Sequence, residues 1–106
     1  MNIQKLMKEA QKAQQKMAEA QERLAAMTVE GSAGGGLVTA TANGQGTINK
    51  ITIDPSTVDP DDVELLEDLV VAAVNEAQRK AKELQESELG SAVGNMGGMS
   101  GLGNLF

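Results

Sequence analysis

The feature that most constrains this chain is a heptad pattern close to its N-terminus. Between residues 3 and 27, alanines and larger apolar side chains recur at alternating intervals of three and four. This spacing places them on one stripe of an α-helix, the a and d positions of a coiled coil. Neither glycine nor proline interrupts the segment, so it predicts one continuous helix, about 37 Å long, that packs on a partner helix. The stripe consists of Ile3, Leu6, Ala10, Ala13, Met17, Ala20, Leu24 and Met27.

A row of lysines runs along the same predicted helix, although the chain has a formal net charge of −6. Lys8, Lys12 and Lys16 are spaced four residues apart, and like charges at this spacing destabilise a helix slightly. On the heptad, Lys5, Lys8 and Lys12 fall at c and f positions, away from the partner helix, and Lys16 flanks the stripe at a g position. These lysines either form a solvated face or bind a negatively charged ligand.

Residues 28–54 have the chemistry of β-strands. Three short runs rich in β-branched residues are separated by glycine-containing turns at residues 34–36 and 43–46, which predicts a three-stranded antiparallel meander. Alternation puts Val38, Ala40 and Ala42 on one face of their strand, and Ile51 and Ile53 share a face of theirs. Ile48 is out of step with that pair, so we expect a β-bulge near residues 49–50.

A second helix is predicted from Asp59 onward. Asp59 suits the N-cap, Pro60 suits the first helical position, and further acidic residues favour the positive end of the helix dipole. The first half of this helix is apolar nearly all round, which is typical of a buried helix, so we expect it to pack on the sheet and on a second subunit. The expected dimer contacts are Leu66, Leu69, Val70 and Val74.

Charge is segregated along the chain. Residues 1–16 hold four lysines and one glutamate, a charge of +3, whereas residues 54–68 hold seven acidic residues and no basic one. If the two helices are antiparallel, Arg79, Lys80 and Lys82 lie at the same end as the N-terminal lysines, far from the sheet. Glu19 precedes Arg23 by four residues, which predicts an ion pair within the first helix.

The organisation that follows is one α+β domain over residues 1–89, with the order α-β-β-β-α, and a glycine-rich tail over residues 90–106 without packed structure. A chain of 106 residues with a single aromatic residue has a small core, and such domains are often completed by oligomerisation.

Several classes of function lack the residues they need. The absence of cysteine and histidine removes disulfides, the usual zinc ligands and the commonest nucleophile–base pairs. We expect no enzyme activity, no small-molecule substrate, and no metal or other cofactor: "GGGLV" precedes a strand and lacks the lysine of a phosphate loop, and the acidic cluster at residues 59–64 suits helix capping. No apolar run is long enough to span a membrane, so a cytoplasmic protein is expected.

Four stretches together resemble the YbaB/EbfC family of nucleoid-associated proteins: "MKEAQKAQQKM", "GGGLV", "ITIDP" and "LLEDLVVAAVNEAQRKA". The resemblance covers nearly the whole chain. It implies a tweezer-shaped homodimer that binds duplex DNA through protruding helical arms, and a location on the bacterial nucleoid.

Two functional hypotheses follow. In the first, the homodimer alters DNA conformation, organisation and gene expression, and it binds double-stranded DNA through Lys5, Lys8, Lys12, Lys16, Arg79, Lys80 and Lys82. Lysines act on phosphates as point charges that carry little sequence information. In the second, the chain is a prefoldin-like coiled-coil holdase or adaptor that grips client proteins with its helical arms. The polar and basic N-terminal helix and the self-contained set of three strands favour the first hypothesis.

Overall fold

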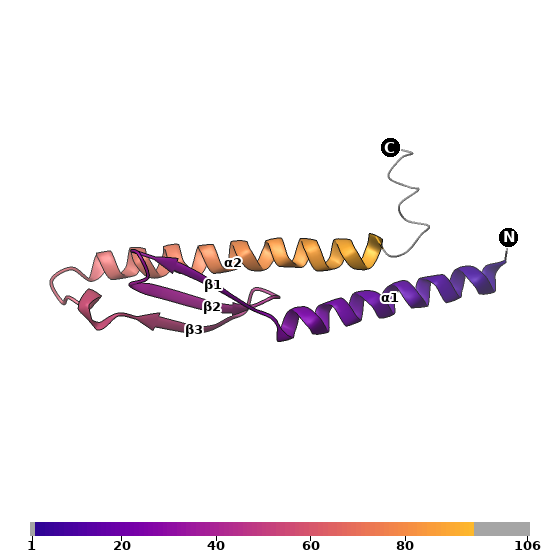
Figure 1. Ribbon diagram of the computed structural model, residues 1–106, viewed down its shortest axis with the longest axis horizontal. Helices are drawn as coiled ribbons and strands as arrows, with labels where there is room; N and C mark the ends of the chain where they lie inside the picture. The colour runs from indigo at the N-terminus through magenta and orange to yellow at the C-terminus, as the bar shows by residue number, and fades with distance from the viewer. Residues whose placement is uncertain (1, 95–106) are drawn as a thin grey trace, which may run out of the picture.

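The computed structural model describes residues 2–94 of the chain and confirms the order α-β-β-β-α. One long helix lies along a three-stranded sheet and the other leads away from one end of that sheet, so the molecule is elongated (Figure 1). The elements are α1 (Ile3–Ala26), β1 (Thr28–Ala33), β2 (Val38–Asn43), β3 (Ile48–Ile53), the short 3-10 helix η1 (Pro55–Thr57) and α2 (Val63–Gly94).

Helix α1 is capped by a neighbouring residue at its start and by a turn distant in the chain at its end. The Asn2 side-chain oxygen accepts hydrogen bonds from the backbone N–H groups of Gln4 (3.1 Å) and Lys5 (3.4 Å), which satisfies donors that have no partner in the first turn. At the other end, the backbone N–H of Gly44 donates to the carbonyl of Leu24 at 2.8 Å. The turn between β2 and β3 therefore holds the end of α1 against the sheet.

The sheet is an antiparallel meander with the strand order β1-β2-β3, as predicted. The pairing of β2 with β3 shifts between Thr41, which faces Lys50, and Ala42, which faces Ile48. Asn49 is thus the extra residue of a β-bulge, which confirms the expected irregularity. The bulge brings Ile48 onto the same face as Ile51 and Ile53.

Helix α2 packs on β1 and β2 through small side chains. Ala73 and Ala77 are fully buried against Val38, Ala40 and Ala42, which confirms the shared face predicted for the last three. A Cβ atom at Gly31 would overlap the backbone of α2 at Ala73 and Ala77. Alanines and this one glycine let the helix axis approach the sheet closely.

The same helix leaves the β3 side of the sheet uncovered, since α2 makes few contacts with β3. Ile51 remains 39% exposed and Ile53 37% exposed, although they share the face on which α2 packs. On α2 itself, Val63 and Val71 are mostly exposed. The four expected dimer residues, in contrast, are half-buried against their own chain's core: Leu66, Leu69, Val70 and Val74.

Both ends of α2 differ from the sequence-based boundaries. Asp59 does not cap α2: its carboxylate accepts a hydrogen bond from the N–H of Asp61 (2.9 Å) in a preceding turn. The side chain of Asp62 accepts from the N–H of Leu65 (3.3 Å) and occupies the capping position of a helix that begins at Val63. α2 continues to Gly94, beyond the boundary predicted at residue 89. The predicted tail residues 95–106 lie outside the described part of the chain.

Candidate nucleic-acid interface

The four lysines of α1 form one stripe along the helix. At about 100° per residue, Lys5, Lys8, Lys12 and Lys16 fall within an arc of about 80°, over a length of about 17 Å. The first three are exposed and Lys16 is half-buried. Their ammonium groups therefore project from one side of α1. The centre of this stripe lies about 95° around the helix from the centre of the buried pair Ala20 and Leu24, and Lys16 is about 40° from Ala20.

None of the four lysines forms an ion pair within the described residues. The three ion pairs within residues 2–94 involve Arg23, Arg79 and Lys80, and none involves a lysine of α1. Glu9 is the single acidic residue among residues 2–16, and it forms no ion pair in that part of the chain. The stripe keeps its positive charge available for an external anion.

The ion pair formed by Arg23 shows that α2 packs beside the C-terminal part of α1. Its Nε lies 3.2 Å from Oε2 of Glu88 on α2, so the predicted pair with Glu19 is wrong; Glu19 instead accepts a hydrogen bond from the side chain of Gln15 (3.3 Å). The tertiary packing brings a second helix with its own carboxylate within reach of Arg23, and that partner replaces the one on the same helix.

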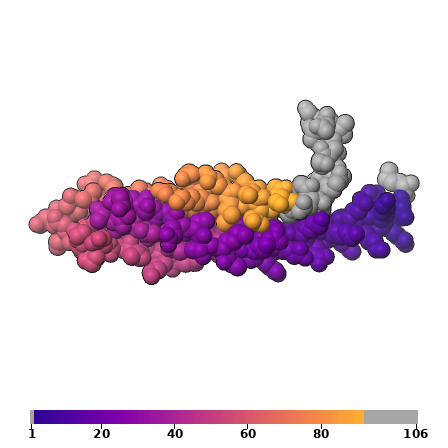
Figure 2. Space-filling model, viewed as in Figure 1, coloured from indigo at the N-terminus to yellow at the C-terminus, as the bar shows by residue number. Residues whose placement is uncertain are grey.

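The lysine stripe lies mainly on a part of α1 that has no described helix beside it. The helices are antiparallel, and counting along both from the Arg23–Glu88 pair puts the end of α2 at Gly94 level with Met17. Every residue of α1 from Ile3 to Lys12 is exposed. In the space-filling view the indigo end of α1 extends well past the yellow end of α2 (Figure 2). We refer to residues 3–16 as the arm.

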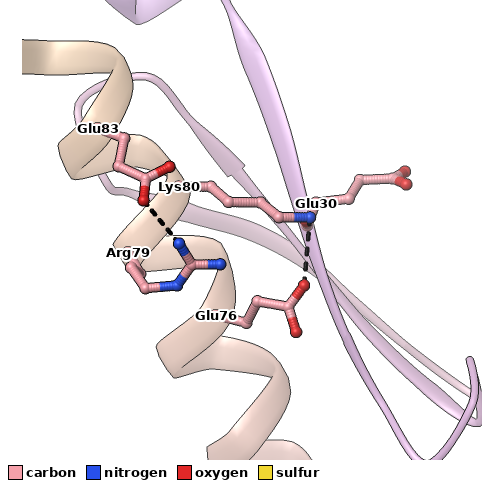
Figure 3. A network of polar contacts seen from close by, with 5 residues as sticks. All are labelled: Glu30, Glu76, Arg79, Lys80 and Glu83. Atoms are coloured by element: carbon pink, nitrogen blue, oxygen red, sulfur yellow. Dashed lines mark hydrogen bonds and ion pairs between the residues drawn. The ribbon is translucent and has the colours of Figure 1, made fainter.

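The basic residues of α2 do not join the arm, which corrects the expected arrangement. The Nζ of Lys80 lies 3.2 Å from Oε1 of Glu76 and donates a hydrogen bond of 2.8 Å to the carbonyl of Glu30 in β1. Arg79 Nη1 lies 2.6 Å from Oε1 of Glu83. Figure 3 shows both cations turned toward carboxylates beside the sheet, and Lys82 on the next turn is exposed.

The basic residues of α2 lie beside the sheet, and not beside the arm, because the sheet extends along α2 as far as Lys80. Gly31 of β1 contacts Ala77 closely, and the neighbouring Glu30 accepts a hydrogen bond from Lys80, so β1 lies beside this part of the helix. Lys80 lies about 12 Å from Glu88 toward the sheet, whereas Lys8 lies about 22 Å from Arg23 in the opposite direction. Lys8 and Lys80 are therefore about 34 Å apart along the molecule.

Comparison with known proteins gives this geometry a context. A model of the YbaB/EbfC DNA-binding family matches residues 1–96. The chain belongs to this family. It is 53% identical to a nucleoid-associated protein of Saccharopolyspora erythraea over 98% of this chain and 90% of that one. A nucleoid-associated protein of Acetivibrio thermocellus is 54% identical over 95% and 89% of the two chains.

The fold of this YbaB/EbfC chain also occurs among solved structures. The crystal structure of an uncharacterized protein from Helicobacter pylori superposes with a TM-score of 0.74, covering 82% of this chain and 91% of the other, at 21% identity. At that level of identity the likeness concerns the fold alone, and it supports the α-β-β-β-α subunit.

The charge of the molecule changes from negative to positive along its long axis. The segment of residues 59–68, which is rich in acidic side chains, lies at the sheet end, around the start of α2. The lysines of the arm lie at the opposite end of the molecule (Figure 1). Asp54, just before the acidic segment, caps η1: its carboxylate accepts hydrogen bonds from the N–H of Ser56 (2.9 Å) and from its hydroxyl (2.8 Å). These bonds hold the pKa of Asp54 below its ordinary value, the backbone bond contributing most.

Other kinds of site find no support in residues 2–94. No group of three or more acidic residues there is arranged to hold a metal ion. None of the described helices combines the length and the apolarity that crossing a bilayer requires.

One surface was missed by reasoning from the sequence. Four apolar side chains of β3 and α2 are 37–58% exposed, and we refer to them together as the open face: Ile51, Ile53, Val63 and Val71. The alternation of β3 placed both isoleucines on one side of the strand but did not indicate whether a helix covers them. That depends on where α2 crosses the sheet.

Proposed function

We propose that this protein is a nucleoid-associated protein that binds duplex DNA as a homodimer, with the lysines of the two arms on the phosphate backbone. The single observation that carries the proposal is the arm itself: four lysines on one side of a helix with no carboxylate partner among the described residues. Membership of a DNA-binding family supports the same ligand.

The chemistry of the arm suits the backbone of DNA better than its bases. Ammonium groups are point charges that attract phosphates without reading sequence. The lysine stripe is interspersed with glutamines, including Gln11 and Gln15, whose neutral amides can donate hydrogen bonds to phosphate oxygens. With two arms per dimer we expect roughly 4–8 phosphate contacts. Binding would then organise DNA, and change its shape and accessibility, over many sequences.

The residues of α2 take a smaller part in this proposal. Arg79 and Lys80 are each held by a carboxylate, so their charge is partly neutralised before DNA arrives. Lys82 has no ion pair within residues 2–94 and stays exposed. We retain Arg79, Lys80 and Lys82 as a secondary contact zone beside the sheet, which DNA would reach only by extending past the arm toward the body.

The open face is our candidate for the dimer interface. Each Å² of apolar surface that is removed from water contributes about 25 cal/mol of stabilisation. A second copy related by twofold symmetry would cover the open face with an equivalent surface. Leu66, Leu69, Val70 and Val74 would form the floor of this interface, since their own sheet buries them only in part. A dimer built this way keeps both arms free.

A client-binding coiled-coil protein is the rival function. Its strongest support is that Ile3, Leu6 and Met7 are exposed near the tip of the arm. The family match and the unneutralised lysines favour DNA over a protein client.

The test is fluorescence anisotropy of a labelled duplex of about 30 base pairs of random sequence, titrated with the native protein over a range of salt concentrations. We expect binding whose log–log salt dependence has a slope of about −0.9 for each phosphate contact, so roughly −4 to −7 for the dimer. Absence of binding at low salt would overturn the proposal. Suppression of aggregation of a denatured client protein would then support the rival.

A further inference from the structure

Helix α1 leaves the body at a junction with the turn between β2 and β3, residues 44–47 (Figure 1). The backbone N–H of Gly44 donates hydrogen bonds to the carbonyl of Leu24 (2.8 Å) and to that of Met27 (3.1 Å). A Cβ atom at Gly44 would come within 2.5 Å of the Leu24 carbonyl oxygen. A residue without a side chain therefore lets the turn lie against the backbone at the end of the helix.

Two glutamine side chains join this turn to the two helices. Nε2 of Gln85 on α2 donates a hydrogen bond to the carbonyl of Gly44 (3.0 Å), in a half-buried position. Nε2 of Gln45 donates to the carbonyl of Gln21 on α1 (3.2 Å). These bonds connect α2 to the turn and the turn to α1. We call Gly44, Gln45 and Gln85 the clamp.

The turn that carries the clamp has its backbone fixed by Asn43. The side-chain oxygen of Asn43 accepts hydrogen bonds from the N–H groups of Gln45 (2.9 Å) and Thr47 (3.1 Å). The N–H of Asn43 donates to the carbonyl of Thr47 (2.9 Å). An asparagine that binds the backbone of its own turn in this way holds the turn in one conformation, so Gly44 and Gln45 are presented to α1 in a defined position.

The clamp contacts α1 on a different side from its buried stripe. α1 packs mainly on α2, and Ala20 and Leu24 are fully buried. Gln21, whose carbonyl Gln45 binds, lies about 80° around the helix from the centre of that pair. Packing along one narrow stripe allows a helix to rock about the stripe, whereas a second contact at another angle opposes that motion. The clamp therefore restrains the direction in which α1 leaves the body.

Small changes of direction at this junction are amplified along the arm. Lys5 lies about 28 Å along α1 from Leu24. A rotation of about 10° at the level of Leu24 would move Lys5 sideways by about 5 Å. Along each strand of duplex DNA, one phosphate charge follows another every ~3.4 Å of helix axis. The direction of the arm thus decides which phosphates its lysines reach.

We propose that Gln45 and Gln85 are positioning residues for DNA binding, which fix the direction of the arm so that the lysines of both arms meet phosphates at the same time. This inference rests on the proposed function, because it concerns the same contact with DNA. Neither glutamine belongs to the arm and neither carries a charge, so their contribution is preorganisation, which lowers the ordering cost of binding. Engagement of two arms at once depends on such geometry.

The first measurement is the direction of the arm, by double electron–electron resonance in the full-length chain. The chain has no cysteine, so Gln4→Cys near the tip of α1 and Gly90→Cys on α2, both at exposed positions, provide two unique sites for nitroxide labels. An excess of unlabelled chain ensures that only distances within one copy are measured. We expect a narrow distribution of distances in this background.

The test variant adds Gln45→Ala and Gln85→Leu, which remove both side-chain hydrogen bonds while leucine keeps most of the volume at the half-buried position. The distribution should become about twice as wide, because an arm held by fewer contacts samples more directions. A distribution that stays narrow would overturn the proposal. Circular dichroism checks folding, and Gln45→Ala alone, at an exposed position, should give an intermediate width and provides the same test in a milder form.

The matched control is Gln78→Leu, which removes a glutamine amide from an exposed position on the same helix, about 10 Å from Gln85 toward the sheet. This variant should keep the narrow distribution. Equal broadening in the control would overturn the assignment, since the effect would then not come from the bonds of the clamp.

The second measurement is the affinity for labelled duplex DNA over a range of salt concentrations. In the test variant Kd should rise about tenfold, with an unchanged log–log salt slope because every lysine of the arm is still present. A wider distribution with native affinity would overturn the role of the clamp in DNA binding. Absence of DNA binding by the native protein would instead overturn the proposed function, and the resonance distances would still show whether the clamp fixes the arm.

Discussion

Gly31 of β1 lies directly against the backbone of Ala77 in α2, with no space for a Cβ atom between them. This contact sets the distance between the helix and the sheet. The contact also places β1 beside α2 as far as Lys80, whose ammonium group donates a hydrogen bond to the carbonyl of Glu30. The contact between a glycine and an alanine thus determines that the basic residues of α2 lie beside the sheet and not beside the arm.

Substitution of Gly31 by alanine should destabilise the fold. The new methyl group would overlap backbone atoms of Ala73 and Ala77, which cannot move independently of α2. We expect a loss of at least about 2 kcal/mol in the free energy of unfolding, measured by urea denaturation. Gly35→Ala is the matched control: its Cβ meets no atom within 4 Å, but φ is +69°, so we expect a cost of about 1 kcal/mol from backbone strain alone. Equal costs would contradict the close contact.

Neutralising one lysine of the arm should weaken DNA binding through its salt dependence. In Lys12→Gln, each dimer loses two phosphate contacts, so the magnitude of the log–log salt slope should fall by about 1.8. Lys50→Gln removes the same charge from an exposed position on β3, away from the arm, and should change the slope little. If both variants lower the slope equally, the effect reflects net charge and not a contact of the arm.

A charge on the open face should separate the dimer without unfolding the subunit. Val71 is 58% exposed and is not among the residues packed on the core. In Val71→Lys we expect dissociation at concentrations where the native protein is dimeric, because each subunit loses the burial of a valine, about 1.5–3 kcal/mol, and gains an ammonium group.

Sedimentation velocity measures that change, and circular dichroism checks that the subunit remains folded. The control is Leu65→Lys, at an exposed apolar position of α2 that points roughly away from the open face. A folded dimer in Val71→Lys would exclude this surface as the interface, and a monomer in Leu65→Lys would place the interface on the other side of α2.

Asp54 should titrate below the ordinary range of an aspartate. Its folded-state pKa is lowered by hydrogen bonds from Ser56, so its contribution to stability is present above the pKa of the unfolded chain and is lost as the pH falls through the folded-state pKa. NMR titration of the carboxyl carbon should show this low midpoint. Ser56→Ala removes the hydroxyl bond and keeps the backbone bond, so the midpoint should rise part of the way toward the ordinary value. An unchanged midpoint in that variant would show that the hydroxyl bond does not contribute.

The local order of the chain follows from its sequence. The three-four spacing from Ile3 to Met27 requires a helix with a partner, because no other repeat places those side chains on one stripe. The phase change between Ile48 and Ile51 requires a bulge, because strand side chains alternate strictly. The lysines of the arm share one side of α1 for the same kind of reason, since a helical period fixes their directions before any tertiary contact forms.

The tertiary structure decided what each of these surfaces faces. Arg23 pairs with Glu88 instead of Glu19 because the packing of α1 on α2 brings a carboxylate from 65 residues away within reach. Lys80 lies at the sheet because Gly31 admits Ala77, and Ile51 and Ile53 are exposed because α2 crosses β1 and β2. Periodicity determines the direction of a side chain within its own element, whereas the position of one element on another depends on packing between residues far apart in the chain.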